Sequence, residues 1–201
     1  MLTQMPSKTD LLKGIRDEVW ALKDSPLYQY RIENKNFPVL GEGSHDAHIM
    51  LVGEAPGKNE AKTGRPFCGA AGKILDELLA HIGIARAFVY ITNIVKDRPP
   101  ENRDPFPDEI ALYGPFLDRQ IDIIQPKVLA GLGRFSSAYL MQLFHINDTR
   151  PISSLHGEIF EATAPYGTVH ILPLYHPAAA IYNQSLKDTL KKDFAVLKKF
   201  L

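Results

Sequence analysis

Apolar residues are spaced along the chain in two alternating patterns, one typical of amphipathic helices and the other of buried strands. A spacing of three to four positions predicts a first helix that ends before Pro26; its apolar residues are Leu11, Leu12, Ile15, Val19 and Leu22. An irregular segment containing Pro, Gly and Asn follows over residues 25–44. Beyond it we expect buried strands at residues 48–53, 88–94, 127–131 and 169–175.

Helical patterns separate these strands, which indicates a parallel sheet. The expected helices cover residues 74–82, 107–124, 135–144 and 186–201, and a hairpin or edge segment is expected around residues 157–160. The predicted fold class is α/β: a three-layer α/β/α arrangement around a central, mainly parallel four-stranded sheet. We expect a single domain over residues 1–201, with residues 1–44 packed on it as a helix and an irregular segment.

Composition and charge exclude several classes of protein. The 201 residues include 23 Lys and Arg against 23 Asp and Glu, and this balance argues against a non-specific polycation. The one cysteine, Cys68, rules out an internal disulfide and fits a reducing compartment. Apolar runs are far shorter than the roughly 20 residues of a membrane helix, and residues 1–13 lack the apolar core of a secretory signal. We therefore expect a cytoplasmic protein without a membrane segment.

The candidate chemistry lies in loops that follow the predicted strands, because ligands of parallel α/β sheets bind at the carboxyl ends of strands. After the first strand come Gly53-Glu-Ala-Pro-Gly57 and Gly64-Arg-Pro-Phe67. Their spacing does not fit a phosphate-binding loop of the Walker type. A Gly- and Pro-rich turn would explain the glycines but not the two carboxylates, Glu54 and Glu60, near the aromatic Phe67.

Two further loops place polar side chains at the same edge of the predicted sheet. Residues 92–105 read Thr-Asn-Ile-Val-Lys-Asp-Arg-Pro-Pro-Glu-Asn-Arg-Asp-Pro. The amide of Asn93 can read the edge of a base, and cations of the loop can contact phosphates: Lys96, Arg98 and Arg103. A rigid surface loop with solvated charges is the alternative. His176 follows the last buried strand, where an imidazole can donate to a developing anion, although a lone histidine is more often structural.

Together these motifs resemble the uracil-DNA glycosylase superfamily, most closely its family 4, over about residues 50–201. The matching motifs are Gly53-Glu-Ala-Pro-Gly57, Gly64-Arg-Pro-Phe67, the loop over residues 92–105, and His176-Pro-Ala-Ala179. The resemblance implies a hydrolase of base excision DNA repair, a monofunctional glycosylase that flips uracil out of DNA, hydrolyses its N-glycosidic bond and leaves an abasic site. Its partner would be uracil-containing DNA, single- or double-stranded, and we expect a monomer.

The resemblance also implies catalytic roles in a uracil pocket. Phe67 would stack on the base. Asn93 would donate to O4 and accept from N3–H, a pattern that cytosine reverses. His176 would face O2 and stabilise the negative charge on the departing base.

The same resemblance assigns two carboxylates and the surrounding DNA contacts. Glu54 would position water or support the sugar cation, and Glu60 would guard the C5 side of the base against thymine. Ala55 stands where better-known uracil glycosylases carry a water-orienting Asp, so the partner of the water stays open. DNA contacts are expected from Lys96, Arg98, Arg103, Leu155, His156, Gly157, Ala179 and Ile181, with Leu155 or Ile181 as an apolar wedge.

Family 4 proteins usually hold a four-iron cluster with four cysteines, and this chain retains none of the four. Leu22, Ser25, Asp97 and Tyr113 stand at the matching positions. Because one thiolate cannot hold such a cluster, we predict a colourless protein with no cofactor or metal, in which Asp97 pairs with a neighbouring Arg or Lys. Two other functions stay open: a glycosylase of the same fold for hypoxanthine or xanthine, and a non-catalytic relative that binds damaged DNA.

Overall fold

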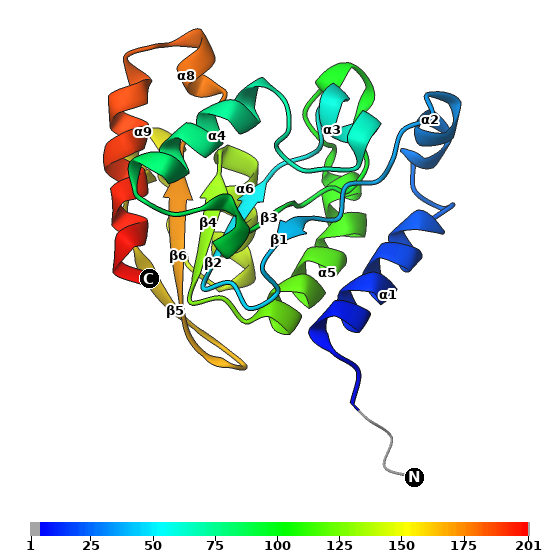
Figure 1. Ribbon diagram of the computed structural model, residues 1–201, viewed down its shortest axis with the longest axis horizontal. Coiled ribbons are helices and arrows are strands. Elements are labelled where there is room, and N and C mark those ends of the chain that lie inside the picture. The colour runs from blue at the N-terminus through cyan, green and yellow to red at the C-terminus, as the bar shows by residue number, and fades with distance from the viewer. Residues whose placement is uncertain (1–4, 201) are drawn as a thin grey trace.

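A mixed sheet with helices on both faces forms the centre of the computed structural model, which describes residues 5–200 (Figure 1). Within this part of the chain the sheet has six strands in the order β1-β3-β2-β4-β6-β5. The strands are β1 (Glu42–Gly43), β2 (Ile49–Gly53), β3 (Tyr90–Asn93), β4 (Val128–Leu132), β5 (Phe160–Ala164) and β6 (Gly167–Leu174). The predicted three-layer α/β/α fold is confirmed.

The four central strands β3, β2, β4 and β6 are parallel, as predicted, but the sheet is wider than four strands. Antiparallel strands extend both edges, β1 beside β3 and β5 beside β6. β1 has two residues, too few to produce a recognisable pattern. The expected edge segment near residues 157–160 lies a few residues later, where β5 and β6 form a hairpin. Phe88, predicted in a strand, lies in a 3-10 turn and is 72% exposed.

Helices cover the two faces of the sheet, and each predicted helix is among them, although the last one ends at Ala195 and continues as a 3-10 helix over Val196–Phe200. They are α1 (Lys8–Trp20), α2 (Tyr28–Glu33), α3 (Lys58–Thr63), α4 (Ala70–His81), α5 (Pro107–Ile124), α6 (Arg134–Leu143), α7 (Ile152–Leu155), α8 (Ala179–Tyr182) and α9 (Leu186–Ala195). None of the helices within residues 5–200 is long and apolar enough to cross a membrane. Residues 1–4 and 201, which the predicted domain and its last helix include, lie outside the described residues.

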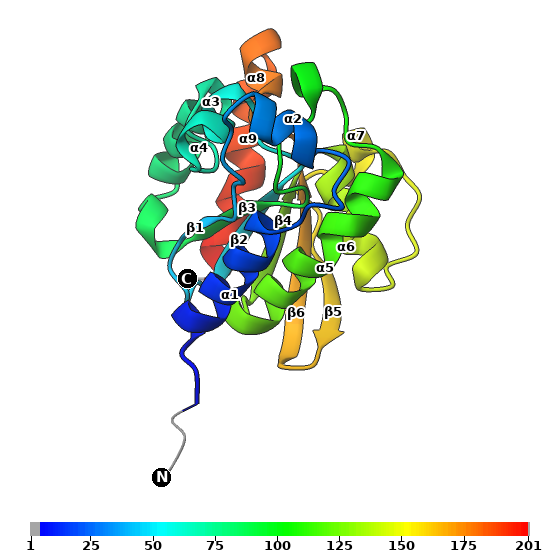
Figure 2. The same cartoon turned by 90° about the vertical axis from the view of Figure 1, so that its right-hand side faces the viewer.

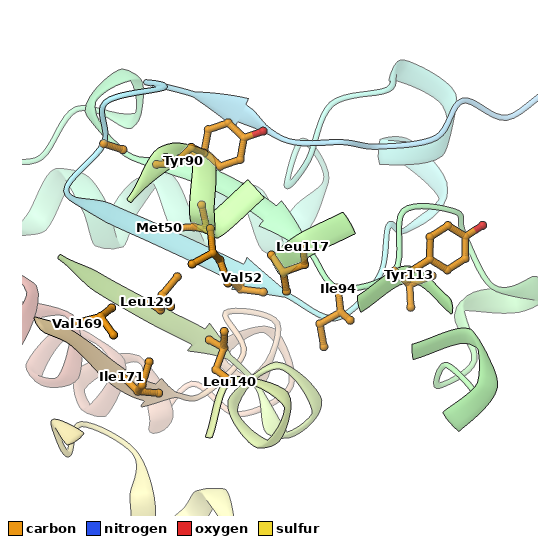
Figure 3. Close-up of a cluster of buried hydrophobic side chains, with 14 of the residues drawn as sticks. Met50, Val52, Tyr90, Ile94, Tyr113, Leu117, Leu129, Leu140, Val169 and Ile171 are labelled. Carbon is orange, nitrogen blue, oxygen red and sulfur yellow. The ribbon is translucent and has the colours of Figure 1, made fainter. Parts of the chain in front are cut away.

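Two apolar cores lie on opposite faces of the sheet because successive strand residues point to opposite sides. In β2, Met50 and Val52 pack toward α5 and α6, and Figure 3 shows them in one cluster with residues of the neighbouring strands. Ile49 and Leu51 pack toward α4 and α9. The continuous burial of β2 follows from this double coverage, and it explains why its sequence is an unbroken apolar run.

The N-terminal helix α1 packs beside α5 (Figure 2). Ser7 caps it in a reciprocal box with Asp10, which satisfies backbone N–H groups of the first turn. Its buried face is made by Leu12, Ile15 and Val19. The pattern of the sequence therefore locates both the helix and the side that packs on the domain.

Candidate active site

A cavity of about 250 Å³ lies among the loops that follow the parallel strands. Its wall is formed by Ala55, Gly57, Glu60, Phe67, Ala71, Asn93, Asn102, His176 and Ala178. The structure thus brings together five of the six residues expected in the uracil pocket. The sixth, Glu54, is not part of the wall. These loops meet because the carboxyl ends of parallel strands share one edge of the sheet.

Asn93 is the last residue of β3 and presents its carboxamide to the cavity. It is 2% exposed and lies opposite Gly53 in the β2–β3 ladder. Within residues 5–200 the side-chain hydrogen bond to Asn93 goes to its backbone carbonyl, from Nζ of Lys96 at 2.6 Å. A Cβ at Gly53 would lie 2.3 Å from Oδ1 of Asn93 and 2.8 Å from the ring of Phe67. The glycine therefore makes the space in which the amide and the aromatic ring meet.

Phe67 is held in an unusual backbone conformation beside this amide. Its φ is 47°, in the left-handed region that costs a non-glycine residue about 1–3 kcal/mol. Gly72 allows this turn, because a Cβ there would lie 1.8 Å from the carbonyl oxygen of Phe67. The ring is 6% exposed. Such stored strain is typical of functional sites.

His176 lies in the loop after β6 as a neutral imidazole. Burial lowers the pKa of His176 to about 4, and the carboxylate of Glu60 opposes this only in part. The backbone N–H of Ala178 donates to Nδ1 at 3.2 Å. Because Nδ1 accepts, the ring proton resides on Nε2, and the imidazole can donate one hydrogen bond without carrying a charge.

The two expected carboxylates have different surroundings. One oxygen of Glu60 accepts hydrogen bonds from the backbone N–H groups of Cys68 (3.0 Å) and Gly69 (2.8 Å), so Glu60 supports the loop that carries Phe67. Glu54 is half-buried outside the cavity wall. Burial raises the pKa of Glu54 to about 7, with a further rise from Asp104 and an opposing effect of Arg134. Glu54 can thus accept a proton near neutrality.

Asn102 is a wall residue that sequence reasoning missed. Its φ of 56° is again left-handed, which asparagine tolerates better than most residues. Nε of Arg98 donates to its Oδ1 at 2.8 Å, which leaves the NH₂ group of Asn102 free to donate. The sequence shows Asn102 as the second asparagine of the 92–105 loop, but the direction of its side chain depends on the fold of that loop.

Two of the expected DNA contacts are wrong because the side chains are buried. Lys96 is 0% exposed and lies beneath the cavity. Leu155, the last residue of α7, is 4% exposed and packs in the core, so it is not available as a wedge. Arg103 forms two hydrogen bonds with Glu109, at 2.6 and 2.8 Å, and its guanidinium lies over the ring of Phe106.

The other expected DNA contacts lie near the cavity loops. His156 stacks on Tyr175 with ring centroids 4.4 Å apart, and its Nδ1 lies 2.8 Å from the carboxylate of Asp193. Gly157 donates its N–H to the carbonyl of Pro173 at 2.9 Å. Beyond His176, helix α8 begins at Ala179 and exposes two large side chains, Ile181 (43%) and Tyr182 (90%). Tyr182 lies in the stretch after His176, residues 179–183, that the sequence predicts to contact DNA, although the sequence does not single it out.

Three of the four positions matched to cluster cysteines form a buried polar network instead. The hydroxyl of Tyr113 donates to Asp97 at 2.6 Å and lies 2.7 Å from that of Ser25. Asp97 pairs with an arginine, as expected: Nη1 of Arg31 lies 3.0 Å from its carboxylate. Arg31 also donates to the carbonyls of Val19 and Trp20. Leu22 packs at the edge of the core. This set has no thiol, and the exposed Cys68 lies in the loop that follows Phe67, so the residues do not fit an iron–sulfur cluster.

Comparison with known proteins agrees with this geometry. Residues 40–199 match the family model of the uracil DNA glycosylase superfamily. A type-4 uracil-DNA glycosylase of Sulfurisphaera tokodaii is 45% identical over 190 residues, which cover 94% of this chain and 84% of the relative. Another, of Thermotoga maritima, is 36% identical over 98% of both chains. A type-5 uracil-DNA glycosylase of Thermus thermophilus is 32% identical over 69% of this chain and 68% of the relative. The chain therefore belongs to the uracil-DNA glycosylase superfamily, and it is more similar to these type-4 members than to this type-5 member.

Proposed function

We propose that the protein is a monofunctional DNA glycosylase that hydrolyses the N-glycosidic bond of a uracil flipped out of DNA. The observation that carries the proposal is the carboxamide of Asn93, which is buried in the cavity wall and whose neighbours bond only its backbone. Asn93 lines the cavity, so the oxygen and NH₂ group of its amide are open to a ligand with a matching donor and acceptor. The type-4 relatives are uracil-DNA glycosylases, which supports the same substrate.

Uracil recognition follows from the donor and acceptor of that amide. Asn93 donates to O4 and accepts from N3–H, while Phe67 stacks on the ring. Cytosine offers a donor and an acceptor in the reverse order, so the amide would leave two groups unpaired. A site that hydrogen-bonds its substrate rejects such an analogue strongly.

Bond cleavage depends on His176 and Glu54. The C1′–N1 bond breaks with its electron pair leaving on the base, and the negative charge collects in part on O2. The Nε2–H of neutral His176 donates to this oxygen, in a dry site where such a bond is strong. Water adds to C1′, and Glu54, with its pKa raised to about 7, takes the proton of the water. The NH₂ group of Asn102 is free to hold that water or a sugar oxygen.

DNA approaches across the mouth of the cavity. Ile181 and Tyr182 of α8 are the exposed apolar groups nearest in sequence to His176, and we assign the wedge to them. Phosphate contacts are assigned to Arg98 and Arg103, with His156, Gly157 and Ala179 beside them. We propose that a monomer acts on uracil in single- or double-stranded DNA, away from membranes and in the cytoplasm where a nucleoid would lie.

We also propose that catalysis needs no cofactor or metal. The polar network of Arg31, Asp97, Tyr113 and Ser25 occupies the place of the cluster ligands. Pure protein is expected to be colourless, with iron far below one equivalent per chain by elemental analysis. Several equivalents of iron in active protein would contradict this proposal.

The test uses labelled single- and double-stranded oligonucleotides that hold one uracil, hypoxanthine or xanthine, followed by alkaline cleavage of abasic sites. Excision of uracil alone, lost in Asn93→Ala and His176→Ala, is the expected result. Excision of hypoxanthine or xanthine in preference to uracil would show that the proposed substrate is wrong and that the enzyme acts on that base instead. Binding without cleavage of any substrate would make the protein a damaged-DNA binder.

A further inference from the structure

A fully buried lysine lies directly behind the amide that faces the cavity. Lys96 is 0% exposed, and its Nζ donates to the backbone carbonyl of Asn93 at 2.6 Å, to Oε1 of Gln120 at 2.6 Å and to the hydroxyl of Thr92 at 2.9 Å. Buried lysines are rare and need a full set of acceptors. Lys96 therefore has a role inside the protein and none at the DNA surface.

The three acceptors are held so that each faces the ammonium. The hydroxyl of Thr92 gives its proton to the carbonyl of Leu40 at 2.6 Å. The NH₂ group of Gln120 donates to the same carbonyl at 2.9 Å and to Tyr90, which fixes Oε1 toward Lys96. An ammonium has three N–H donors, one for each oxygen, whereas a neutral amine would turn its lone pair toward one of them.

Burial and the surrounding contacts have opposite effects on the pKa of Lys96. Burial lowers the pKa of Lys96 to about 7, and the carboxylate of Asp118 on α5 acts in the opposite direction. The oxygens of Thr92, Asn93 and Gln120 also favour the charged form, because hydrogen bonds to a charged donor are stronger than those to a neutral one. The charged form, which makes all three contacts, is therefore populated below and around neutral pH.

The contact with Asn93 completes a clamp on one peptide group. Lys96 binds the carbonyl of Asn93, and the next N–H, of Ile94, donates to the carbonyl of Gly53 at 3.0 Å. Both ends of the peptide after Asn93 are therefore held. From this fixed backbone the carboxamide lies over Gly53 and beside the ring of Phe67, in the wall of the cavity.

We propose that Lys96 is a positioning residue for base recognition, which fixes the backbone of Asn93 so that its carboxamide meets the uracil edge already oriented. This inference rests on the proposed role of Asn93. The carboxamide has to be oriented before the base binds, because a displacement of about 1 Å at a reacting or recognising group can lower the rate by about 100-fold. Lys96 itself touches neither base nor DNA.

The test is a double-mutant cycle between Lys96→Met and Asn93→Ala. Methionine has a similar length and removes all three donors. Single-turnover excision of uracil from single-stranded DNA is expected to fall roughly 10- to 100-fold in Lys96→Met, and no further when the change is made in Asn93→Ala. Leu140→Ala is the matched control: it weakens the buried core away from Asn93 and should keep the wild-type rate below its own melting temperature.

The possible results distinguish failure of the positioning role of Lys96 from failure of the proposed function. If Lys96→Met lowers the rate by the same factor with and without Asn93, or leaves the wild-type rate unchanged, the positioning role is wrong. If the wild type does not excise uracil, or Asn93→Ala excises it normally, the proposed function fails first. Should Lys96→Met not fold, Thr92→Val removes one of the three acceptors and must show the same dependence on Asn93.

Discussion

The ring of Phe67 stacks on the imidazole of His176, with centroids 5.6 Å apart and planes inclined by 30°. The two side chains come from loops after different strands, β2 and β6. Their contact removes water from one face of the imidazole, which contributes to the burial that keeps His176 neutral. A neutral imidazole can donate a hydrogen bond to the negative charge that develops on the leaving base, and it stays uncharged itself.

Replacing His176 by alanine should lower uracil excision by about 100- to 1,000-fold, the usual cost of removing one donor to a developing anion. The single-turnover rate should fall while the affinity for uracil-containing DNA stays within a few-fold. Quenched-flow or manual single-turnover assays with a binding titration measure both quantities. A loss of affinity as large as the loss of rate would mean that His176 binds substrate instead of stabilising its transition state.

The pH dependence of the reaction should report Glu54. Its carboxyl has a pKa raised to about 7, so the rate should increase with pH as Glu54 ionises, up to the range in which Lys96, whose pKa burial lowers to about 7, loses its charge. The pKa of His176, about 4, keeps this residue neutral over the same range. Glu54→Gln should lose the increase with pH. A profile with the same midpoint in this variant would assign the titration to another group.

The same shift predicts a change in stability. The pKa of Glu54 is higher in the folded protein than in the unfolded chain, so the folded state binds more protons between about pH 4.5 and 7. The contribution of Glu54 to stability is therefore present below this range and is lost as the pH rises through it. Glu54→Gln should flatten this part of the curve when the free energy of urea unfolding is measured against pH.

Gly53→Ala should abolish most activity while the protein stays folded. The added Cβ would collide with the ends of two side chains, Asn93 and Phe67, which can move away into the cavity. A loss of about 100-fold in the excision rate is expected from this misplacement. Gly14→Ala in α1 is the control, since nothing lies within 4 Å of its Cβ, and helix propensity predicts a gain of about 0.5–1 kcal/mol in stability. Wild-type activity in Gly53→Ala would contradict the close packing at this point.

The buried network around Asp97 should contribute strongly to stability. Asp97 and Arg31 are 1% and 4% exposed, and Asp97→Asn leaves the guanidinium without its counter-charge, which should cost about 3 kcal/mol in the free energy of unfolding. Glu18→Gln breaks an ion pair with Arg119 whose side chains are 51% and 47% exposed, and it should cost less than about 1 kcal/mol. Equal effects of the two changes in urea unfolding would show that the network carries no special stability.

The central strands and five residues of the pocket wall could be predicted from the sequence. Unbroken apolar runs such as residues 49–53 occur where a strand is covered on both faces, and alternation with helical patterns makes the strands parallel. Parallel strands bring their carboxyl ends to one edge. For this reason Asn93, Phe67 and His176, far apart in the chain, could be assigned to one site before any coordinates were known.

Only the tertiary structure decided which side chains face the DNA and which face the interior. Lys96 lies in a loop with two other cations, and its sequence neighbourhood gives no sign that Thr92, Asn93 and Gln120 would surround its ammonium. Leu155 was expected at the surface but packs in the core. The direction of a long side chain in a loop depends on which distant groups satisfy its charge or cover its apolar surface. That information resides in contacts between segments far apart along the chain, so local patterns determine the elements and packing determines the orientation of their side chains.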